Sequence, residues 1–119
     1  MEFKYKLDNP NPQLRREECQ KLLDKFPEQI PVICEKDMRS TIPQCPKQKF
    51  LVEIDLPFYR FQETLRHKIQ LTKESSLFIL VGGKHSVSTE MLMGDVYKKY
   101  KDPEDGFLYI VYSSELTWG

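Results

Sequence analysis

The feature that most constrains the fold is an apolar run near the end of the chain, residues 106–113, which reads GFLYIVYS. Successive side chains of a strand point to opposite faces, so this run places large apolar groups on both faces. The residues of the two faces are Phe107, Tyr109 and Val111 on one and Leu108, Ile110 and Tyr112 on the other. A strand that is apolar on both faces belongs in the middle of a sheet that is covered on at least one side. The run therefore predicts a central strand.

Three other short apolar runs predict further strands. They are residues 30–36, 49–54 and 76–83, and the last of them ends at Gly82 and Gly83. In the second run, KFLVEI, the alternation places Phe50 and Val52 on one face and Leu51 and Glu53 on the other.

Apolar residues at helical spacing predict three helices around these strands. The first covers residues 13–26, the second follows Pro57 for about three turns, and the third follows Ser88 or Thr89, either of which can cap it. The apolar positions are Cys19, Leu22, Leu23 and Phe26; Phe58, Phe61, Leu65 and Ile69; and Met91, Leu92, Val96, Tyr97 and Tyr100. Residues 1–10 fit either a short helix or an extended arm. The resulting order of elements is typical of an α+β roll with one helix packed across a mixed sheet.

Length and composition predict one ordinary globular domain. The chain has 119 residues, of which 39% are hydrophobic and 30% are charged, enough for a hydrophobic core. The 18 Lys and Arg residues balance the 18 Asp and Glu residues, so the net charge does not predict binding to nucleic acid or to an anionic membrane. The balance is not uniform along the chain, because basic residues crowd the first quarter and acidic ones collect at Asp102, Glu104 and Asp105.

No sequence signal predicts export, a membrane span, a metal site or a catalytic site. The longest apolar stretch is far too short to cross a bilayer, and the N-terminal residues lack the apolar core of a secretory signal. Cys19, Cys34 and Cys45 are an odd number without a CxxC pair, so we expect reduced thiols in a cytosolic protein, two of them facing the core. His67 and His85 stand at no ligand spacing. We expect no metal, no cofactor and no catalytic residue, although a Cys34–His67 dyad stays open.

Several separated segments resemble one known family. They are FPEQIPVICEK, KFLVEIDL, LRHKI, SLFILV and DGFLYIVYSSE, the last followed by an aromatic residue and a glycine. In this order they are similar to the GABARAP-like autophagy modifiers, over nearly the whole chain from Phe3 to Gly119. The resemblance implies an α+β fold, a ubiquitin-like β-grasp roll with two additional N-terminal helices. It implies a helical extension, residues 1–27, and a ubiquitin-like domain with a flexible C-terminal tail, residues 28–119, in a single compact unit.

In that family the terminal glycine is the point of conjugation, and Gly119 matches it. The resemblance implies that Gly119 is activated by a dedicated enzyme, passed as a thioester to a conjugating enzyme and joined to the amine of phosphatidylethanolamine. Glycine suits this chemistry because it has no Cβ and leaves its carbonyl group unhindered. Family precursors usually carry residues after the glycine, so Gly119 is either the encoded end or the result of processing or truncation. Trp118 stands where Phe or Tyr is more usual, and a Trp-Gly end resembles a related modifier that is joined to a protein lysine.

The resemblance also implies a peptide-binding groove along the strand 49–54. If this strand lies at the edge of the sheet, an extended peptide can pair with its free N–H and C=O groups. The family's partners present an aromatic residue, two variable residues and an aliphatic residue, often after acidic residues.

The groove residues carried over from the family form three groups. The aromatic pocket would use Glu18, Leu22, Pro31, Lys49, Leu51 and Phe107. The aliphatic pocket would use Phe50, Val52, Leu56, Phe61 and Leu65. The residues meeting an acidic flank would be Lys47, Lys49 and Arg66. Periodicity alone favours a different interpretation. In it Lys47, Lys49 and Arg66 form a solvated face, and plain core packing accounts for Leu22, Phe61, Leu65 and Phe107. A further alternative is that Arg66 braces the C-terminal strand through an acidic partner.

Three groove positions depart from the family pattern. Glu53 replaces a usual proline, Thr64 replaces a usual apolar residue, and Gln29 stands where a basic residue is common. We therefore expect an altered partner preference, with looser binding of the aliphatic side chain.

The leading interpretation is a modifier without enzyme activity that is conjugated to phosphatidylethanolamine on autophagosomal membranes and recruits cargo receptors. The expected partners are the activating and conjugating enzymes, a deconjugating cysteine protease, cargo receptors with aromatic-x-x-aliphatic motifs and the phosphatidylethanolamine membrane, but no nucleic acid. The protein is expected to be a monomer in the cytoplasm, and on the autophagosome membrane when lipidated. Two alternatives stay open, a non-conjugated peptide-binding scaffold in trafficking and a modifier conjugated to a protein lysine.

Overall fold

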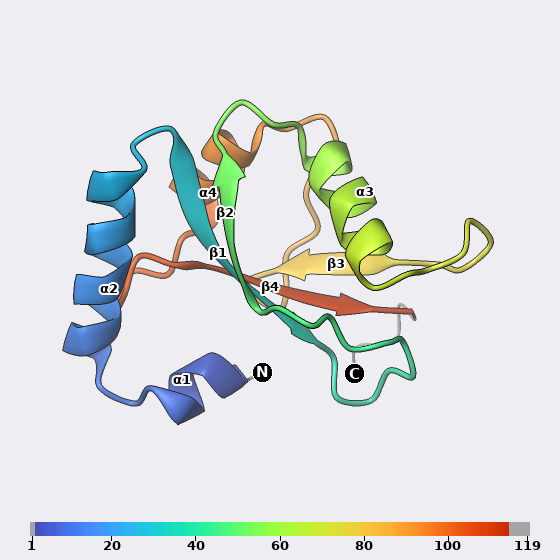
Figure 1. Cartoon of the computed structure of the whole chain (residues 1–119), viewed down its shortest axis with the longest axis horizontal. Coiled ribbons are helices and arrows are strands. Elements are labelled where there is room, and N and C mark those ends of the chain that lie inside the picture. The colour runs from blue at the N-terminus through green and yellow to red at the C-terminus, as the bar shows by residue number, and fades with distance from the viewer. Residues whose placement is uncertain (1, 115–119) are drawn as a thin grey trace.

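The apolar run near the end of the chain forms the centre of a sheet, as predicted. In the computed structural model, which describes residues 2–114, β4 covers Leu108–Ser113 and all six of its residues are buried. β4 pairs in parallel with β1, Gln29–Lys36, in which the six central residues are also buried. β2, Lys49–Glu53, pairs antiparallel with β1, and β3, Phe78–Val81, pairs antiparallel with β4. The strand order is therefore β2-β1-β4-β3 (Figure 1).

Helices cover both faces of this sheet (Figure 1). α1, Lys4–Asp8, and α2, Pro12–Lys25, pack on one face, and α3, Phe58–Lys68, and α4, Met93–Tyr100, pack on the other. The core accordingly has two hydrophobic clusters, and β4 contributes to both. On the side of α1 and α2 lie Tyr109 and Val111 of β4 together with Phe107, the residue before the strand. On the side of α3 and α4 lie Leu108, Ile110 and Tyr112. The sequence required cover on at least one side, and the structure provides it on both.

Polar side chains fix the starts of the two N-terminal helices. Asn11 caps α2, because its side-chain oxygen accepts two hydrogen bonds from backbone N–H groups, at 2.9 and 3.3 Å. The first turn of α1 is capped from the sheet instead. The buried Glu35 carboxylate accepts from the backbone N–H groups of Lys4 and Tyr5, each at 2.8 Å. Of the two forms that the sequence allowed for residues 1–10, the helix is the one adopted, and it is tied to β1.

The start of α4 differs from the prediction. Neither Ser88 nor Thr89 caps this helix, which begins only at Met93. Its first two N–H groups donate to the carbonyl oxygens of Leu56 and Ile54, at 2.7 and 2.8 Å. These carbonyls lie in the connection between β2 and α3. The expected cap was wrong because carbonyl groups from a distant segment take its place, which the local sequence does not reveal.

β3 is shorter than the predicted strand 76–83, and it ends before Gly82 and Gly83 as the sequence indicated. Both glycines have positive φ angles, 66° and 82°. Side chains of other L-residues are disfavoured in this region of backbone conformation, so the pair stops the strand and lets the chain turn away from the sheet.

All three cysteines are buried and free, whereas the sequence predicted two facing the core. Burial raises the pKa of the Cys19 thiol to about 11 and that of the Cys34 thiol well above its usual range. Cys34 has no exposed surface, while His67 is exposed on α3. The structure therefore argues against the Cys34–His67 dyad that the sequence left open.

The N-terminal helices share one hydrophobic cluster with β1 and β4, so they pack as part of the same body. The division into residues 1–27 and 28–119 stays a prediction. Residues 115–119, which make up most of the predicted tail, lie outside the described part of the chain. Within the described part, the helices lack the combination of length and apolar character needed to cross a membrane.

Candidate functional site

β2 is an edge strand. It pairs with β1 from Gln29↔Glu53 to Ile33↔Lys49, and within residues 2–114 no second strand pairs with it. Its other side therefore presents N–H and C=O groups with which an added strand can pair. This was the condition that the sequence set for a peptide-binding groove.

An ion pair joins α2 to β2 beside this edge. The Lys49 ammonium group donates to Oε1 of Glu18. The same ammonium group lies over two aromatic rings, 5.2 Å from the ring centroid of Tyr5 and 5.8 Å from that of Phe107. Such a position is favourable for a cation, because the face of an aromatic ring carries negative potential. Three predicted members of the aromatic pocket, Glu18, Lys49 and Phe107, thus lie together.

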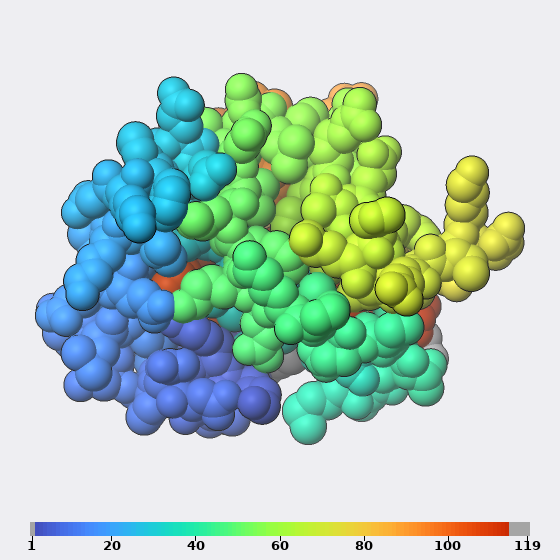
Figure 2. All heavy atoms as spheres, in the orientation of Figure 1, coloured from blue at the N-terminus to red at the C-terminus, as the bar shows by residue number. Residues whose placement is uncertain are grey.

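The other three predicted members of the aromatic pocket border the same place. Pro31 and Leu51 lie opposite each other in the β1–β2 ladder, and Leu51 shares a face of β2 with Lys49. Leu22 is half-buried and packs against the cluster that contains Phe107. Figure 2 shows a recess between the blue α2 and the green β2, in which orange-red atoms from the last part of the chain are visible. Pro31 and Phe107 are buried, whereas Leu22, Lys49 and Leu51 are half-buried. We call the Tyr5 and Phe107 rings under the Lys49 ammonium group the aromatic floor.

Two donors hold the Glu18 carboxylate. Lys49 bonds to Oε1, and the hydroxyl group of Tyr5 donates to Oε2 at 2.5 Å. Partial burial by itself would raise the pKa of Glu18, but the hydrogen bonds from Lys49 and Tyr5 hold that pKa below its ordinary value of 4.5. The carboxylate is therefore ionised at neutral pH and keeps Lys49 over the aromatic floor.

The predicted aliphatic pocket lies at the contact between β2 and α3. The rings of Phe50 and Phe61 pack edge to face, with centroids 6.3 Å apart. Phe50 and Val52 are each 7% exposed, Phe61 is 2% exposed and Leu65 is 1% exposed. Leu56 is partly buried against the same cluster. The five residues are together, and four of them belong to the hydrophobic core. For Phe61 and Leu65 this is the alternative that periodicity favoured.

Lys47, which was predicted, and Lys68, which was not, border the Phe50 end of this cluster. The ammonium groups of Lys47 and Lys68 each lie 5.7 Å from the ring centroid of Phe50. Arg66 was predicted to meet an acidic peptide flank or to brace the C-terminal strand through an acidic partner. It donates to two carbonyl oxygens of the loop 72–75, at 3.2 and 2.7 Å, and so holds the connection between α3 and β3. Its contact with an acidic peptide flank stays a prediction.

The three departures from the family pattern lie at the periphery of the groove. Glu53 is exposed at the end of β2. Thr64 is exposed on α3, where its hydroxyl group donates to the Arg60 carbonyl at 3.0 Å. Gln29 is half-buried and borders a hollow of about 510 Å³ between the start of β1, the connection between β2 and α3, and α4. None of these three side chains belongs to the buried core. Their effect on partner preference stays a prediction.

The predicted conjugation residue, Gly119, and the preceding Trp118 lie outside the described residues. The last described residue, Ser114, is held by Ser40 of the β1–β2 loop. Their hydroxyl oxygens are 3.0 Å apart, and the Ser114 N–H group donates to the Ser40 hydroxyl oxygen at 3.2 Å. The tail therefore starts beside that loop.

The sequence analysis missed a buried ion cluster behind the groove. Arg15 donates to the Asp105 carboxylate at 2.8 Å and to the Asn9 carbonyl oxygen at 2.7 Å. Lys6 forms an ion pair with Asp102 at 2.6 Å. The basic residues of the first quarter thus meet the acidic residues that collect late in the sequence. This segregation of charge was the available signal, but nothing local indicated that the two segments are neighbours.

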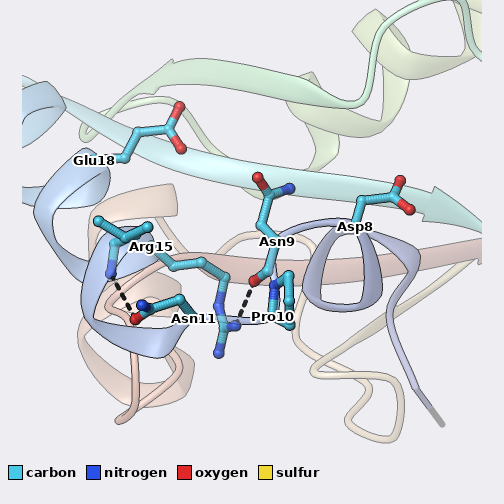
Figure 3. A pocket seen from close by; sticks show the side chains of 7 residues that line it. Asp8, Asn9, Pro10, Asn11, Arg15 and Glu18 are labelled. Carbon is cyan, nitrogen blue, oxygen red and sulfur yellow. Dashed lines mark hydrogen bonds between the residues drawn. The ribbon is translucent and has the colours of Figure 1, made fainter.

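The junction between α1 and α2 forms a small hollow next to this cluster (Figure 3). Its volume is about 230 Å³, and its lining residues are Asp8, Asn9, Pro10, Asn11, Leu14, Arg15 and Glu18. In Figure 3, Arg15 extends back to the Asn9 carbonyl group, whereas Glu18 projects from the next part of α2 towards the sheet. α2 therefore supplies one charged side chain to the interior and another to the groove.

The mixed sheet with α3 and α4 on one face and the two N-terminal helices on the other agrees with the ubiquitin-like roll and N-terminal extension that the resemblance implied. The sequence agrees, because the profile of the family described as "Autophagy protein Atg8 ubiquitin like" matches residues 14–119. The chain belongs to the Atg8 family.

Individual relatives support this assignment. The chain is 42% identical over 105 residues to Autophagy-related protein 8D of Oryza sativa subsp. japonica, covering 88% of each sequence. It is 46% identical over 105 residues to Autophagy-related protein 8 of Pichia angusta, covering 88% of this chain and 82% of that one. Its structure is similar to the crystal structure of Trypanosoma brucei ATG8, with a TM-score of 0.86, 38% identity and 95% of each chain covered. The chain is an autophagy ubiquitin-like modifier, and the predicted family and fold are confirmed.

Proposed function

We propose that this modifier is joined through Gly119 to phosphatidylethanolamine and recruits cargo receptors through the free edge of β2. The observation that carries the proposal is that edge, bordered by the half-buried Leu51 and by the Glu18–Lys49 pair over an aromatic floor. The protein supplies no catalyst, since the nucleophiles belong to its enzymes. It acts in the cytoplasm and, once lipidated, on the autophagosome membrane.

In the proposed binding mode, an extended peptide pairs with β2 and places its aromatic side chain in the recess between α2 and β2. The main-chain hydrogen bonds supply affinity, and the recess supplies selectivity. The aromatic ring can contact Leu22 and Leu51 once the Lys49 ammonium group moves away from Phe107. An acidic residue before the aromatic one then offers Lys49 a replacement for Glu18, with Lys47 nearby on the surface.

In the proposed conjugation, the Gly119 carboxylate attacks ATP to form an acyl adenylate and release pyrophosphate. A cysteine thiolate displaces AMP to form a thioester, and the amine of phosphatidylethanolamine displaces that thiol to form an amide. In the first step a Gly119 carboxylate oxygen attacks the α-phosphorus of ATP. The two later steps require attack at the Gly119 carbonyl carbon, which no side chain shields. The Ser40–Ser114 contact sets the point from which the tail extends to these enzymes, to a deconjugating cysteine protease and to the membrane.

The conjugation is tested by incubating the protein with activating and conjugating enzymes of the pathway, ATP and liposomes that contain phosphatidylethanolamine. Intact-mass spectrometry should show a gain of one lipid, and Gly119→Ala should greatly reduce it. Attachment to a protein lysine in place of the lipid would support the protein-conjugated alternative. An unchanged mass with active enzymes and both acceptors would refute conjugation and leave the peptide-binding scaffold.

The groove is tested by calorimetry with an acidic peptide that carries an aromatic-x-x-aliphatic motif. Leu51→Ala and Lys49→Ala should each weaken binding by about 1–3 kcal/mol, the usual size of a hot-spot loss. Leu80→Ala is the matched control, because Leu80 is also half-buried but lies on β3, the edge strand at the other side of the sheet. Equal affinities for all four proteins would place the peptide elsewhere.

A further inference from the structure

α1 contributes a residue to the groove, although no groove residue was predicted in it. The Tyr5 hydroxyl group donates to Oε2 of Glu18 at 2.5 Å, and the Tyr5 ring packs edge to face against Phe107, with centroids 5.4 Å apart. The Lys49 ammonium group lies 5.2 Å from the Tyr5 ring centroid. Tyr5 therefore contacts both partners of the ion pair that covers the aromatic floor.

The contacts of Tyr5 determine how Glu18 is oriented. One carboxylate oxygen of Glu18 bonds to Lys49 and the other bonds to Tyr5, so the carboxylate is held at both ends. The Glu18 side chain is 44% exposed, and without the second bond its long side chain would sample other rotamers in water. The hydroxyl group of Tyr5 thus keeps the carboxylate where Lys49 meets it.

Tyr5 can hold Glu18 because Tyr5 is itself held by the sheet. Its backbone N–H group donates to the Glu35 carboxylate at 2.8 Å, and the N–H group of Lys4 donates to the other oxygen of the same carboxylate at 2.8 Å. Glu35 is 5% exposed and Tyr5 is 8% exposed. A series of side-chain contacts therefore connects β1 to α1, α1 to α2, and α2 to the free edge strand β2.

We propose that Tyr5 is a positioning residue that sets the preference of the groove for acidic peptides. Its hydroxyl group holds Glu18 onto Lys49, so a peptide carboxylate must compete with an oriented internal carboxylate for the same ammonium group. The hydroxyl group thereby weakens the preference for an acidic residue before the aromatic one. This inference rests on the proposed peptide-binding function of the groove.

The test compares two peptides that differ only in Asp or Asn before the sequence Trp-x-x-Leu. The measured quantity is the ratio of their affinities for each protein. Tyr5→Phe keeps the ring and removes the hydroxyl group, so it should raise the Asp-to-Asn affinity ratio by about 3- to 10-fold. Glu18→Gln removes the competing charge and should raise the ratio at least as much. The double variant should show no further increase, because both changes act on one interaction.

Tyr59→Phe is the matched control. Tyr59 is 40% exposed on α3, so loss of its hydroxyl group should leave the ratio unchanged. In NMR titrations, the pKa of the Glu18 carboxyl should rise in Tyr5→Phe but not in Tyr59→Phe, since only the former loses a donor to the carboxylate. General loosening of α1 would change both affinities together and leave the ratio unaffected.

The possible outcomes separate this inference from the proposed function. Wild-type protein that binds neither peptide would overturn both. Wild-type binding with an unchanged ratio in folded Tyr5→Phe would overturn the inference alone. If Tyr5→Phe does not fold, Glu18→Gln still decides, because an unchanged ratio in that variant would show that Glu18 does not compete for Lys49.

Discussion

Arg15–Asp105 and Glu18–Lys49 are two of the ion pairs that connect α2 to the rest of the molecule, and they differ mainly in burial. Arg15 and Asp105 are 3% and 0% exposed in their side chains, whereas Lys49 and Glu18 are 34% and 44% exposed. Both pairs combine opposite charges at hydrogen-bonding distance, and both join residues that are distant in the sequence. Their surroundings nevertheless give them different roles.

The buried pair is satisfied entirely by the protein. The Asp105 carboxylate accepts from Arg15, from the Tyr109 hydroxyl group at 2.5 Å and from the Phe107 N–H group at 2.9 Å. Arg15 also donates to the Asn9 carbonyl oxygen. With these partners the charges tolerate their removal from water. Loss of Arg15 would leave the Asp105 carboxylate buried without a cation, whereas Arg15 also pairs with the Glu104 carboxylate. The pair therefore belongs to the structure of the fold.

The half-exposed pair remains open to exchange. Water already solvates part of Glu18 and Lys49, so breaking their bond costs little, and in the proposed binding mode a peptide carboxylate replaces Glu18. Burial, more than charge or distance, therefore separates an ion pair that stabilises the fold from one that stays available for exchange.

The largest expected effect is that of Arg15→Met, which leaves Asp105 buried and unpaired. We expect a loss of about 3–5 kcal/mol in the free energy of unfolding, measured by urea denaturation. Arg16→Met is the control, because Arg16 is exposed on the same helix and donates only to carbonyl oxygens; it should cost less than about 1 kcal/mol. Equal losses in the two variants would show that burial is not the deciding factor.

The next largest effect is expected at Gly106, in the turn that supplies Asp105. Its φ angle is +86°, and an added Cβ would lie 3.2 Å from the Cys19 sulfur atom. Gly106→Ala should therefore lower the free energy of unfolding by about 2–3 kcal/mol through strain and overlap. Gly82→Ala has a similar φ of +66° but only an ordinary contact at 3.8 Å, and it should cost about 1 kcal/mol. A larger loss at Gly82 would contradict this account.

Asp102 lies between the two extremes of burial, and its contribution should depend on pH. Partial burial by itself would raise the pKa of Asp102, but Lys6 and two backbone N–H groups hold it below its ordinary value of 3.8. A lowered carboxyl pKa stabilises the fold above the ordinary value and stops doing so as the pH falls through the lowered value. Asp102→Asn should cost about 1–2 kcal/mol at pH 6, and the difference from wild type should shrink below about pH 4. Urea denaturation at several pH values measures this difference in the free energy of unfolding. A difference that persists in acid would show that the ion pair is not its cause.

The smallest effect on stability is expected at the groove. Lys49→Ala should change the free energy of unfolding by less than about 1 kcal/mol, because the pair with Glu18 is half-exposed. The same variant should lose the preference for peptides with an acidic residue before the aromatic one. Thermal denaturation and calorimetry on one protein preparation measure both effects. A loss of stability as large as that of Arg15→Met would erase the distinction between the two pairs.

The elements predicted correctly are those whose signal lies in their own residues. β4 was identified because the alternating residues 107–112 are all large and apolar, so both faces of the strand need cover from water. The same alternation predicted that Phe50 and Val52 lie on one face of β2, and both residues are buried. The start of α4 was predicted wrongly because its first N–H groups bond to carbonyl groups of Ile54 and Leu56, which no local pattern encodes.

The six residues around the aromatic recess could be predicted from the sequence, whereas the contribution of α1 could not. The residues around the aromatic recess followed from the resemblance to the family, and the structure brings all six together. The contact of Tyr5 with Glu18 was not predicted, because the sequence around a single tyrosine in a short helix does not indicate which distant residue it contacts. Its role depends on Glu35, 30 residues away in sequence, which fixes the first turn of α1.

The sequence by itself determined the central strand, the faces of the amphipathic elements and the family, because side-chain periodicity and segment similarity are properties of neighbouring residues. Only the tertiary structure decided which charges are buried and which stay in water. Lys6 and Arg15 look like Lys49 in the sequence, but exposure to solvent depends on how distant segments pack. That packing turns one ion pair into part of the core and leaves the other at the edge of β2.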